Sequence, residues 1–159
     1  MSDETETSGV KLTSDLIYGF VNTLLAKGFD DRQRTPDFHL ELWDLMCSDE
    51  PFVAVAAPRR HAKSTAVTHS FTLANICFRT ASHILIVSDT EAQAINFLGD
   101  IKTEIVENEQ LQELFGIDPK FRKDRESEVV IRYEDGHLCR IVAKGSEQKL
   151  RGVKWRNKR

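Results

Sequence analysis

The sequence has few cysteines and no long apolar run, and both absences exclude classes of protein. Its three cysteines, Cys47, Cys77 and Cys139, are odd in number, far apart and without metal-binding spacing, so we expect unpaired thiols in a reducing cytosol. The longest apolar run, residues 52–57, is far shorter than the ~20 residues that a membrane-spanning helix needs. The N-terminus is acidic and lacks the apolar core of a signal peptide. We therefore expect a protein that is neither secreted nor membrane-spanning.

Charge, by contrast, is abundant and unevenly distributed. Of the 159 residues, 40% are apolar and 30% are charged, a composition typical of one globular domain or of a piece of a larger one. Residues 144–159 hold seven basic residues against one acid, a net charge of +6, whereas residues 1–143 carry −9. This basic tail, residues 144–159, is typical either of contact with a polyanion or of a solvated chain end.

The hydrophobic pattern divides the chain into three parts. Residues 1–12 are small, polar and acidic, and we expect them to be disordered. Residues 13–50 repeat apolar residues every three to four positions, which predicts an N-terminal helical segment. Residues 51–159 contain short apolar runs between helical patterns, and we expect them to form the core.

The N-terminal segment is expected to contain two helices. Thr13 or Ser14 is suited to cap the first helix, and Gly28 is suited to end it in the left-handed conformation. Thr35 is the expected cap of the second helix, with Pro36 in its first turn.

The core segment predicts alternating strands and helices. In chain order we expect a buried strand over 52–57, a helix over 64–79, a buried strand over 83–88, a helix from a Ser88–Glu91 capping box to about Asn108, a short helix over 111–115, a charged loop over 117–127, and strands over 129–133 and 138–142 joined at Asp135-Gly136. This order indicates an α/β fold, with at least two parallel strands flanked by helices plus a β-hairpin. No further apolar strand follows the hairpin, so we expect the sheet to be incomplete.

The segment between the first expected strand and its helix carries the strongest functional signal. The phosphate-binding loop has the pattern G-x-x-x-x-G-K-[ST]; Lys63 and Ser64 match it, while Ala57 and Ala62 stand at its glycine positions. In such a loop the backbone amides and the helix N-terminus face the phosphates, a lysine binds the terminal phosphates, and a hydroxyl binds Mg²⁺. The alternative is a chance Lys-Ser pair at a strand-to-helix turn.

This pattern predicts a site for ATP and Mg²⁺, with Ser64 as the metal ligand. The candidate binding residues are Pro58, Arg59, Arg60, His61, Ala62, Lys63, Ser64 and Thr65.

Four motifs occur in an order that resembles a known family. They are Phe38-His39, Val55-Ala-Ala-Pro-Arg-Arg-His-Ala-Lys-Ser-Thr65, Ile86-Val-Ser-Asp-Thr-Glu-Ala-Gln-Ala94 and Lys149-Leu-Arg-Gly152. Together they resemble the ATPase domain of the large terminase subunit of tailed double-stranded DNA phages, the motor that packages genomes into capsids. The resemblance covers roughly residues 13–159.

The resemblance implies an additional-strand P-loop ATPase core, which a nuclease domain follows in the family. It implies that Lys63 is the Walker A lysine and that Ser64 binds Mg²⁺. Arg151 matches the position of an arginine finger that acts on a neighbouring subunit, and His39 lies where the family contacts adenine. The implied partners are double-stranded DNA, a small terminase subunit, the capsid portal and further copies of the chain in a ring, all in the host cytoplasm.

The sequence departs from the family after the basic tail begins, because the expected strand ending in paired acids is missing. Those acids bind the metal and activate water, so we expect this chain to bind nucleotide but to hydrolyse it poorly alone. Two alternatives remain: a helicase-like, nucleic-acid-dependent ATPase, and a truncated, non-catalytic prophage remnant.

Several other residues have two interpretations each. Trp43 and Phe38 are suited either to stack on adenine or to fill the core. Trp155 is suited either to stack on a base or to pack in a core. His69 is expected to pack, and Gln93 to lie on a helix surface rather than to sense the nucleotide.

Overall fold

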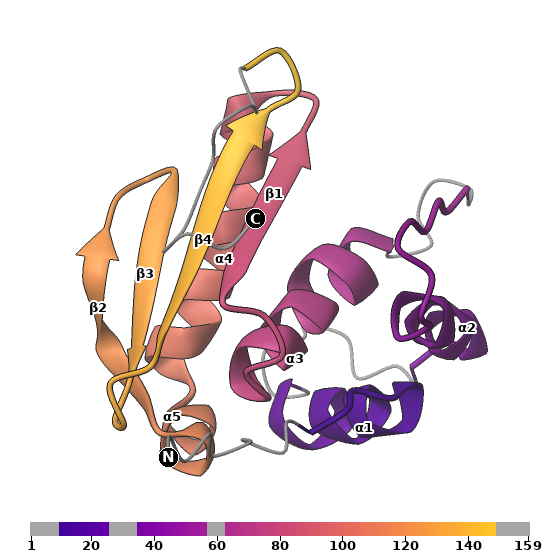
Figure 1. Cartoon of the computed structure of the whole chain (residues 1–159), viewed down its shortest axis with the longest axis horizontal. Helices are drawn as coiled ribbons and strands as arrows, with labels where there is room; N and C mark the ends of the chain where they lie inside the picture. Colours follow the sequence, from indigo (N-terminus) through magenta and orange to yellow (C-terminus); the bar gives the residue numbers. More distant parts are fainter. Residues whose placement is uncertain (1–9, 26–34, 57–62, 149–159) are drawn as a thin grey trace, which may run out of the picture.

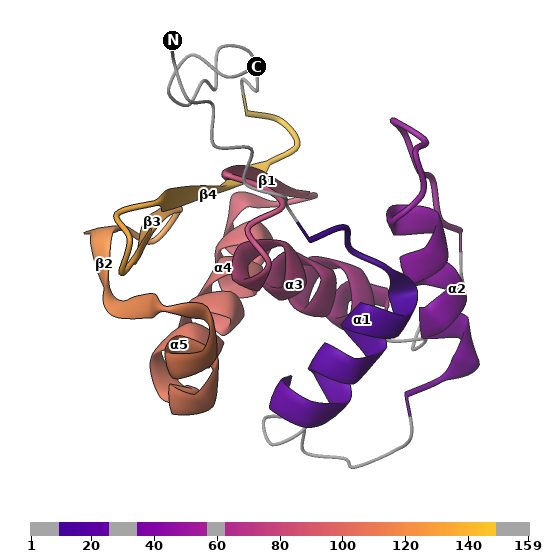
Figure 2. The same cartoon turned by 60° about the horizontal axis from the view of Figure 1, so that its bottom comes forward.

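The computed structural model describes residues 10–25, 35–56 and 63–148, and these form a two-layer α/β structure (Figures 1 and 2). One layer is a four-stranded mixed sheet in the order β1-β4-β3-β2. Its strands are β1 (His83–Ser88), β2 (Ile117–Asp124), β3 (Glu128–Tyr133) and β4 (Leu138–Gly145). β1 runs parallel to β4, and the β4–β3 and β3–β2 pairs are antiparallel. The α/β class is therefore confirmed.

The helices form the second layer, and Figure 2 shows them on one side of the sheet, some beneath it and some beyond its β1 edge. They are α1 (Ser14–Phe20), which continues into the π-helical turn η1 (Val21–Leu25), α2 (Asp37–Met46), the π-helical segment η3 (Thr65–Phe71), which continues into α3 (Thr72–Cys77), α4 (Glu91–Glu107) and α5 (Glu109–Phe115). Within the described ranges, none of these helices has the length and apolar character needed to cross a membrane.

The long helix α4 packs against the sheet with the apolar face that its sequence predicts. Ala94, Leu98, Ile101 and Ile105 are all fully buried. The expected Ser88–Glu91 capping box is wrong, because the cap is Thr90, whose side chain accepts a hydrogen bond from the Gln93 N–H. Ser88 still belongs to β1, since its carbonyl accepts from the Ser146 N–H beside β4.

The expected hairpin is confirmed. β3 and β4 pair in antiparallel register from Glu128 opposite Val142 to Arg132 opposite Leu138. Gly136 in the connecting turn has φ +83°, a value that glycine adopts at little cost and that explains the Asp135-Gly136 signal.

The expected loop over 117–127 is wrong, because residues 117–124 form β2. This strand pairs with β3 at the edge of the sheet, and its register shifts between Asp118 and Lys123. Its charged side chains and Pro119 give no strand signal in the sequence. Proteins place such residues on edge strands, where they prevent further pairing. Asp118 pairs with Arg132 of β3 instead of facing solvent alone.

The expected buried strand over 52–57 is also wrong for residues 52–56, the part that the structure describes. These residues belong to no strand, and Phe52 is 91% exposed. The parallel pair in the structure is β1 with β4, not β1 with this segment. An apolar run forms a strand only where a partner strand completes its hydrogen bonds. The described residues supply no partner strand for residues 52–56. The P-loop arrangement of the sheet therefore stays a proposal.

At the N-terminal end, one of the two expected caps is confirmed. Thr13 caps α1 by accepting a hydrogen bond from the Leu16 N–H. In the second helix Pro36, in an extended conformation, is itself the cap residue, and it lies just outside the helix rather than in its first turn. Thr35 instead donates its hydroxyl to Asn22 Oδ1 at 3.1 Å. Gly28 lies outside the described residues.

The two layers approach each other closely at Gly145. A Cβ on this residue would lie 2.8 Å from the backbone nitrogen of Glu91, at the start of α4. Gly99, in the middle of α4, has nothing within 4 Å of the corresponding position. The two glycines therefore form a matched pair for testing how α4 packs on β4.

We expect Gly145→Ala to lower the free energy of unfolding by roughly 1–3 kcal/mol, because α4 must shift to admit a methyl group. Gly99→Ala should instead raise it by about 0.5–1 kcal/mol, as alanine favours helix more than glycine. Chemical denaturation of both variants measures this. Equal effects of the two substitutions would contradict the packing described.

Glu128 connects three strands of the sheet, and its side chain is only 14% exposed. Its carboxylate accepts hydrogen bonds from Lys123 Nζ of β2 at 2.5 Å and from Arg140 Nε of β4 at 2.7 Å. Burial raises the pKa of Glu128, but these two hydrogen bonds and charges outweigh it, so the pKa lies below its usual 4.5. A lowered pKa in the folded state means that the ionised form stabilises the fold above about pH 4.5.

We expect Glu128→Gln to lower the free energy of unfolding by roughly 1–3 kcal/mol at neutral pH, since hydrogen bonds to a charged group are lost. The difference from the wild type should shrink as the pH falls below 4.5, because the wild-type carboxylate then becomes protonated. Denaturation series across pH measure it, with the exposed Glu126→Gln as control. A difference that does not vary with pH would contradict the assignment.

Candidate functional site

Lys63, Ser64 and Thr65 are the first described residues of a helix that continues without a break through η3 and α3. This confirms the helix expected over 64–79 in all but its last residues. Ser64 is exposed, and Lys63 and Thr65 are half-buried. The π-helical geometry of η3 is rare and often occurs at functional sites. A lysine and a hydroxyl thus lie at the same end of one helix, as phosphate binding requires.

Helix α2 fixes the position of this helix from the side. Trp43 is buried, and its Nε1 donates a hydrogen bond to the carbonyl oxygen of Ala66 at 3.0 Å. His39 is 7% exposed and packs with its ring centre 5.9 Å from that of Trp43. Phe38 is half-buried against the same core. Trp43 is therefore a core residue that anchors the candidate site, and the adenine contact of His39 stays a prediction.

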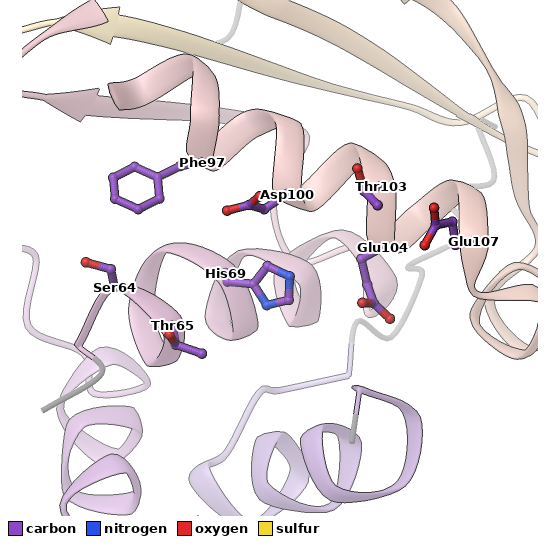
Figure 3. Close-up of a pocket in the computed structure, with 8 residues that line it drawn as sticks. All are labelled: Ser64, Thr65, His69, Phe97, Asp100, Thr103, Glu104 and Glu107. Atoms are coloured by element: carbon purple, nitrogen blue, oxygen red, sulfur yellow. The ribbon is translucent and has the colours of Figure 1, made fainter. Parts of the chain in front are cut away.

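A cavity of about 380 Å³ opens beside Ser64, between this helix and α4 (Figure 3). Its lining residues are Ser64, Thr65, His69, Phe97, Asp100, Thr103, Glu104 and Glu107. Figure 3 shows His69 projecting from one helix and Glu104 from the other into the space between them. The three acids recur along α4 at helical spacing, so they share one face of it.

The charge of this cavity is negative. Burial lowers the pKa of His69 below its usual 6.5, although the nearby Glu104 and Asp100 carboxylates raise it. His69 is therefore neutral at pH 7 and does not offset Asp100, Glu104 and Glu107. Glu104 accepts a hydrogen bond from Asn108 Nδ2 at 2.7 Å, which gives it a role in ending α4. This negative charge disfavours the binding of an anion in the cavity.

The described residues contain no group of three or more His, Cys, Asp or Glu arranged to hold a metal ion. The exposed Ser64 hydroxyl nevertheless suits one position of a Mg²⁺ ion, which usually takes few protein ligands and fills the others with phosphates and water. The metal role of Ser64 therefore stays a prediction.

The remaining predicted site residues fall into two groups. Pro58, Arg59, Arg60, His61 and Ala62 lie outside the described residues, as do Arg151 and Trp155. Gln93 is exposed, as expected, and its Oε1 accepts a hydrogen bond from the Ser88 hydroxyl at 2.5 Å.

The sequence analysis missed the acidic face of α4. The i, i+4, i+7 spacing of its acids can be seen in the sequence, but the sequence does not show that η3 packs opposite them.

Comparisons with protein-family models, with curated proteins and with solved structures found no match to this chain.

We expect the double substitution Asp100→Asn with Glu107→Gln to strengthen ATP binding by roughly two- to fivefold at low salt, because it removes repulsion between exposed charges worth a few tenths of a kcal/mol each. Titration calorimetry measures the dissociation constant, and Glu113→Gln on α5 is the control. Weaker binding in the double variant would mean that these acids help to hold the metal instead.

Proposed function

We propose that this chain binds ATP with Mg²⁺ through Lys63 and Ser64, and that it is the ATP-binding part of a viral DNA-packaging motor. The observation that carries the proposal is the position of these two residues. In the sequence they follow two arginines, Arg59 and Arg60, and they stand in the first described turn of a helix that runs from Lys63 to Cys77, with Ser64 exposed. Helix N-termini favour anions through free N–H groups and the helix dipole.

Each residue has a distinct role in the proposed site. The Lys63 ammonium neutralises the terminal phosphates, and the Ser64 hydroxyl is a ligand of Mg²⁺. Arg59 and Arg60, close before Lys63 in the sequence, add positive charge. The acidic cavity beside Ser64 disfavours phosphate on that side.

The assignment to a packaging motor rests on the resemblance to large terminase subunits. In that setting the partners are double-stranded DNA, a small terminase subunit and the capsid portal, with several copies of the chain in a ring. Arg151 then stabilises negative charge on a neighbour's phosphates during hydrolysis. The basic tail, with a net charge of +6, suits a contact with DNA or phosphate.

Hydrolysis by this chain alone should be slow. Phosphoryl transfer to water needs a carboxylate that orients the water and supports the metal, usually at the end of a strand. Asp89 follows β1, but it is exposed in the turn that leads to the Thr90 cap. We therefore propose that binding, and not turnover, is the property of the isolated chain.

We expect Lys63→Ala to raise the dissociation constant for ATP by roughly 10–100-fold, because a charge-assisted interaction of about 1.5–3 kcal/mol is lost. Ser64→Ala should weaken binding only when Mg²⁺ is present. The exposed Lys11→Ala is the matched control and should bind as the wild type does. Titration calorimetry with and without Mg²⁺ measures all three.

The same series tests the alternatives. Unchanged binding in Lys63→Ala would remove this loop from the proposed site. ATP-dependent separation of DNA strands by the wild type would favour a helicase-like remodeller. Absence of binding by the wild type would favour a non-catalytic remnant.

A further inference from the structure

The helix that carries Lys63 and Ser64 contains a stretch of unusual geometry. It is π-helical over Thr65–Phe71 and α-helical over Thr72–Cys77. A π-helix bonds each N–H to the carbonyl five residues earlier, whereas an α-helix uses the carbonyl four residues earlier. The π-helical stretch therefore holds more residues in each turn than an α-helix does.

One hydrogen bond from another helix enters this stretch. The indole Nε1 of Trp43, on α2, donates to the carbonyl oxygen of Ala66 at 3.0 Å. Both residues are 1% exposed, so water has little access to this bond. An indole N–H can only donate, and burying it without an acceptor is costly. The bond therefore couples the position of α2 to a carbonyl in the first turn of the π-helical stretch.

The bond lies where it can favour the π-helical geometry. Helix carbonyls that bond to a group outside the helix tilt away from its axis, and their helical hydrogen bonds lengthen. A side chain that inserts into the backbone hydrogen bonds of a helix is also a known cause of local departure from α-helical geometry. A donor on α2 that draws the Ala66 carbonyl outward thus stabilises the wider π-helical turn.

The geometry of this stretch decides where Lys63 and Ser64 point. Both lie on its N-terminal side, and α3 on its C-terminal side is held in the core, since Leu73, Ala74 and Ile76 are fully buried. If the stretch became α-helical, its hydrogen bonds would shift by one residue, and the residues before it would turn by about 100° relative to α3. Ser64, which is now exposed, would turn to another side of the helix, and Lys63 with it.

We infer that Trp43 is a positioning residue of the candidate site at Lys63 and Ser64. Its bond to Ala66 keeps residues 65–71 π-helical, and that geometry presents the lysine and the serine to the ligand. Trp43 is buried, so it acts through Ala66 and not by contact with phosphate. The inference rests on the proposed function, because it concerns how the same two residues are held.

A substitution that removes only the N–H tests the inference. Trp43→benzothienylalanine has a sulfur atom in place of the indole N–H and nearly the same volume, so the core stays filled. The matched control is Tyr133→Phe, which removes the bond from the buried Tyr133 hydroxyl to the carbonyl of Ile76 at 2.6 Å, in the α-helical part of the same helix. Each variant loses one buried hydrogen bond to a carbonyl, so we expect similar losses of stability in chemical denaturation.

NMR spectroscopy measures the helix geometry without any ligand. Nuclear Overhauser effects between backbone protons of residues 65–71 distinguish the π-helical from the α-helical pattern. We expect the Trp43 variant to lose the π-helical pattern and Tyr133→Phe to keep it. A π-helical pattern that persists in the Trp43 variant would overturn the inference, whatever the affinity of that variant for ATP.

Titration calorimetry with ATP and Mg²⁺ measures the consequence for the site. We expect the Trp43 variant to raise the dissociation constant by roughly tenfold, within the range expected for loss of the Lys63 contact itself, and Tyr133→Phe to leave it unchanged. Unchanged affinity in the Trp43 variant, or equal weakening in both variants, would overturn the inference. A wild type that binds no ATP would refute the proposed function and with it the role of Trp43 at this site, while the NMR comparison shows separately whether Trp43 sets the helix geometry.

Discussion

The parallel pairing of β1 with β4 is the contact on which the rest of this structure depends. It brings together two segments more than fifty residues apart in the chain and holds them in register from His83 opposite Arg140 to Ser88 opposite Gly145. The pairing also fixes α4, because the backbone of Glu91 lies so close to Gly145 that no side chain fits between them. A parallel pair needs such a crossover helix, and here α4 leaves β1 and packs directly across both strands.

The position of α4 determines the electrostatic character of the candidate site. Its buried residues turn toward the sheet, so Asp100, Glu104 and Glu107 turn toward η3 and line a cavity beside Ser64. In the sequence, Arg59 and Arg60 precede Ser64 by five and four residues. An exposed serine beside an acidic cavity suits a bound metal ion better than it suits phosphate alone. This environment is compatible with the proposed role of Ser64 in binding Mg²⁺.

Local signals predicted the parts of the fold that depend on neighbours in sequence. The Asp135-Gly136 turn, the apolar face of α4 and the helix that follows Lys63 were all predictable, because turn geometry and helical periodicity are set within a few residues. The strand expected over 52–56 failed because strand formation depends on a partner that the pattern cannot specify. The strand over 117–124 was missed for the opposite reason: its charges suit an edge, and only the pairing with β3 makes it a strand. For the candidate site, the sequence predicted Lys63 and Ser64, whose roles stay predictions, but not the acidic face of α4 beside them, because that depends on the packing of two helices.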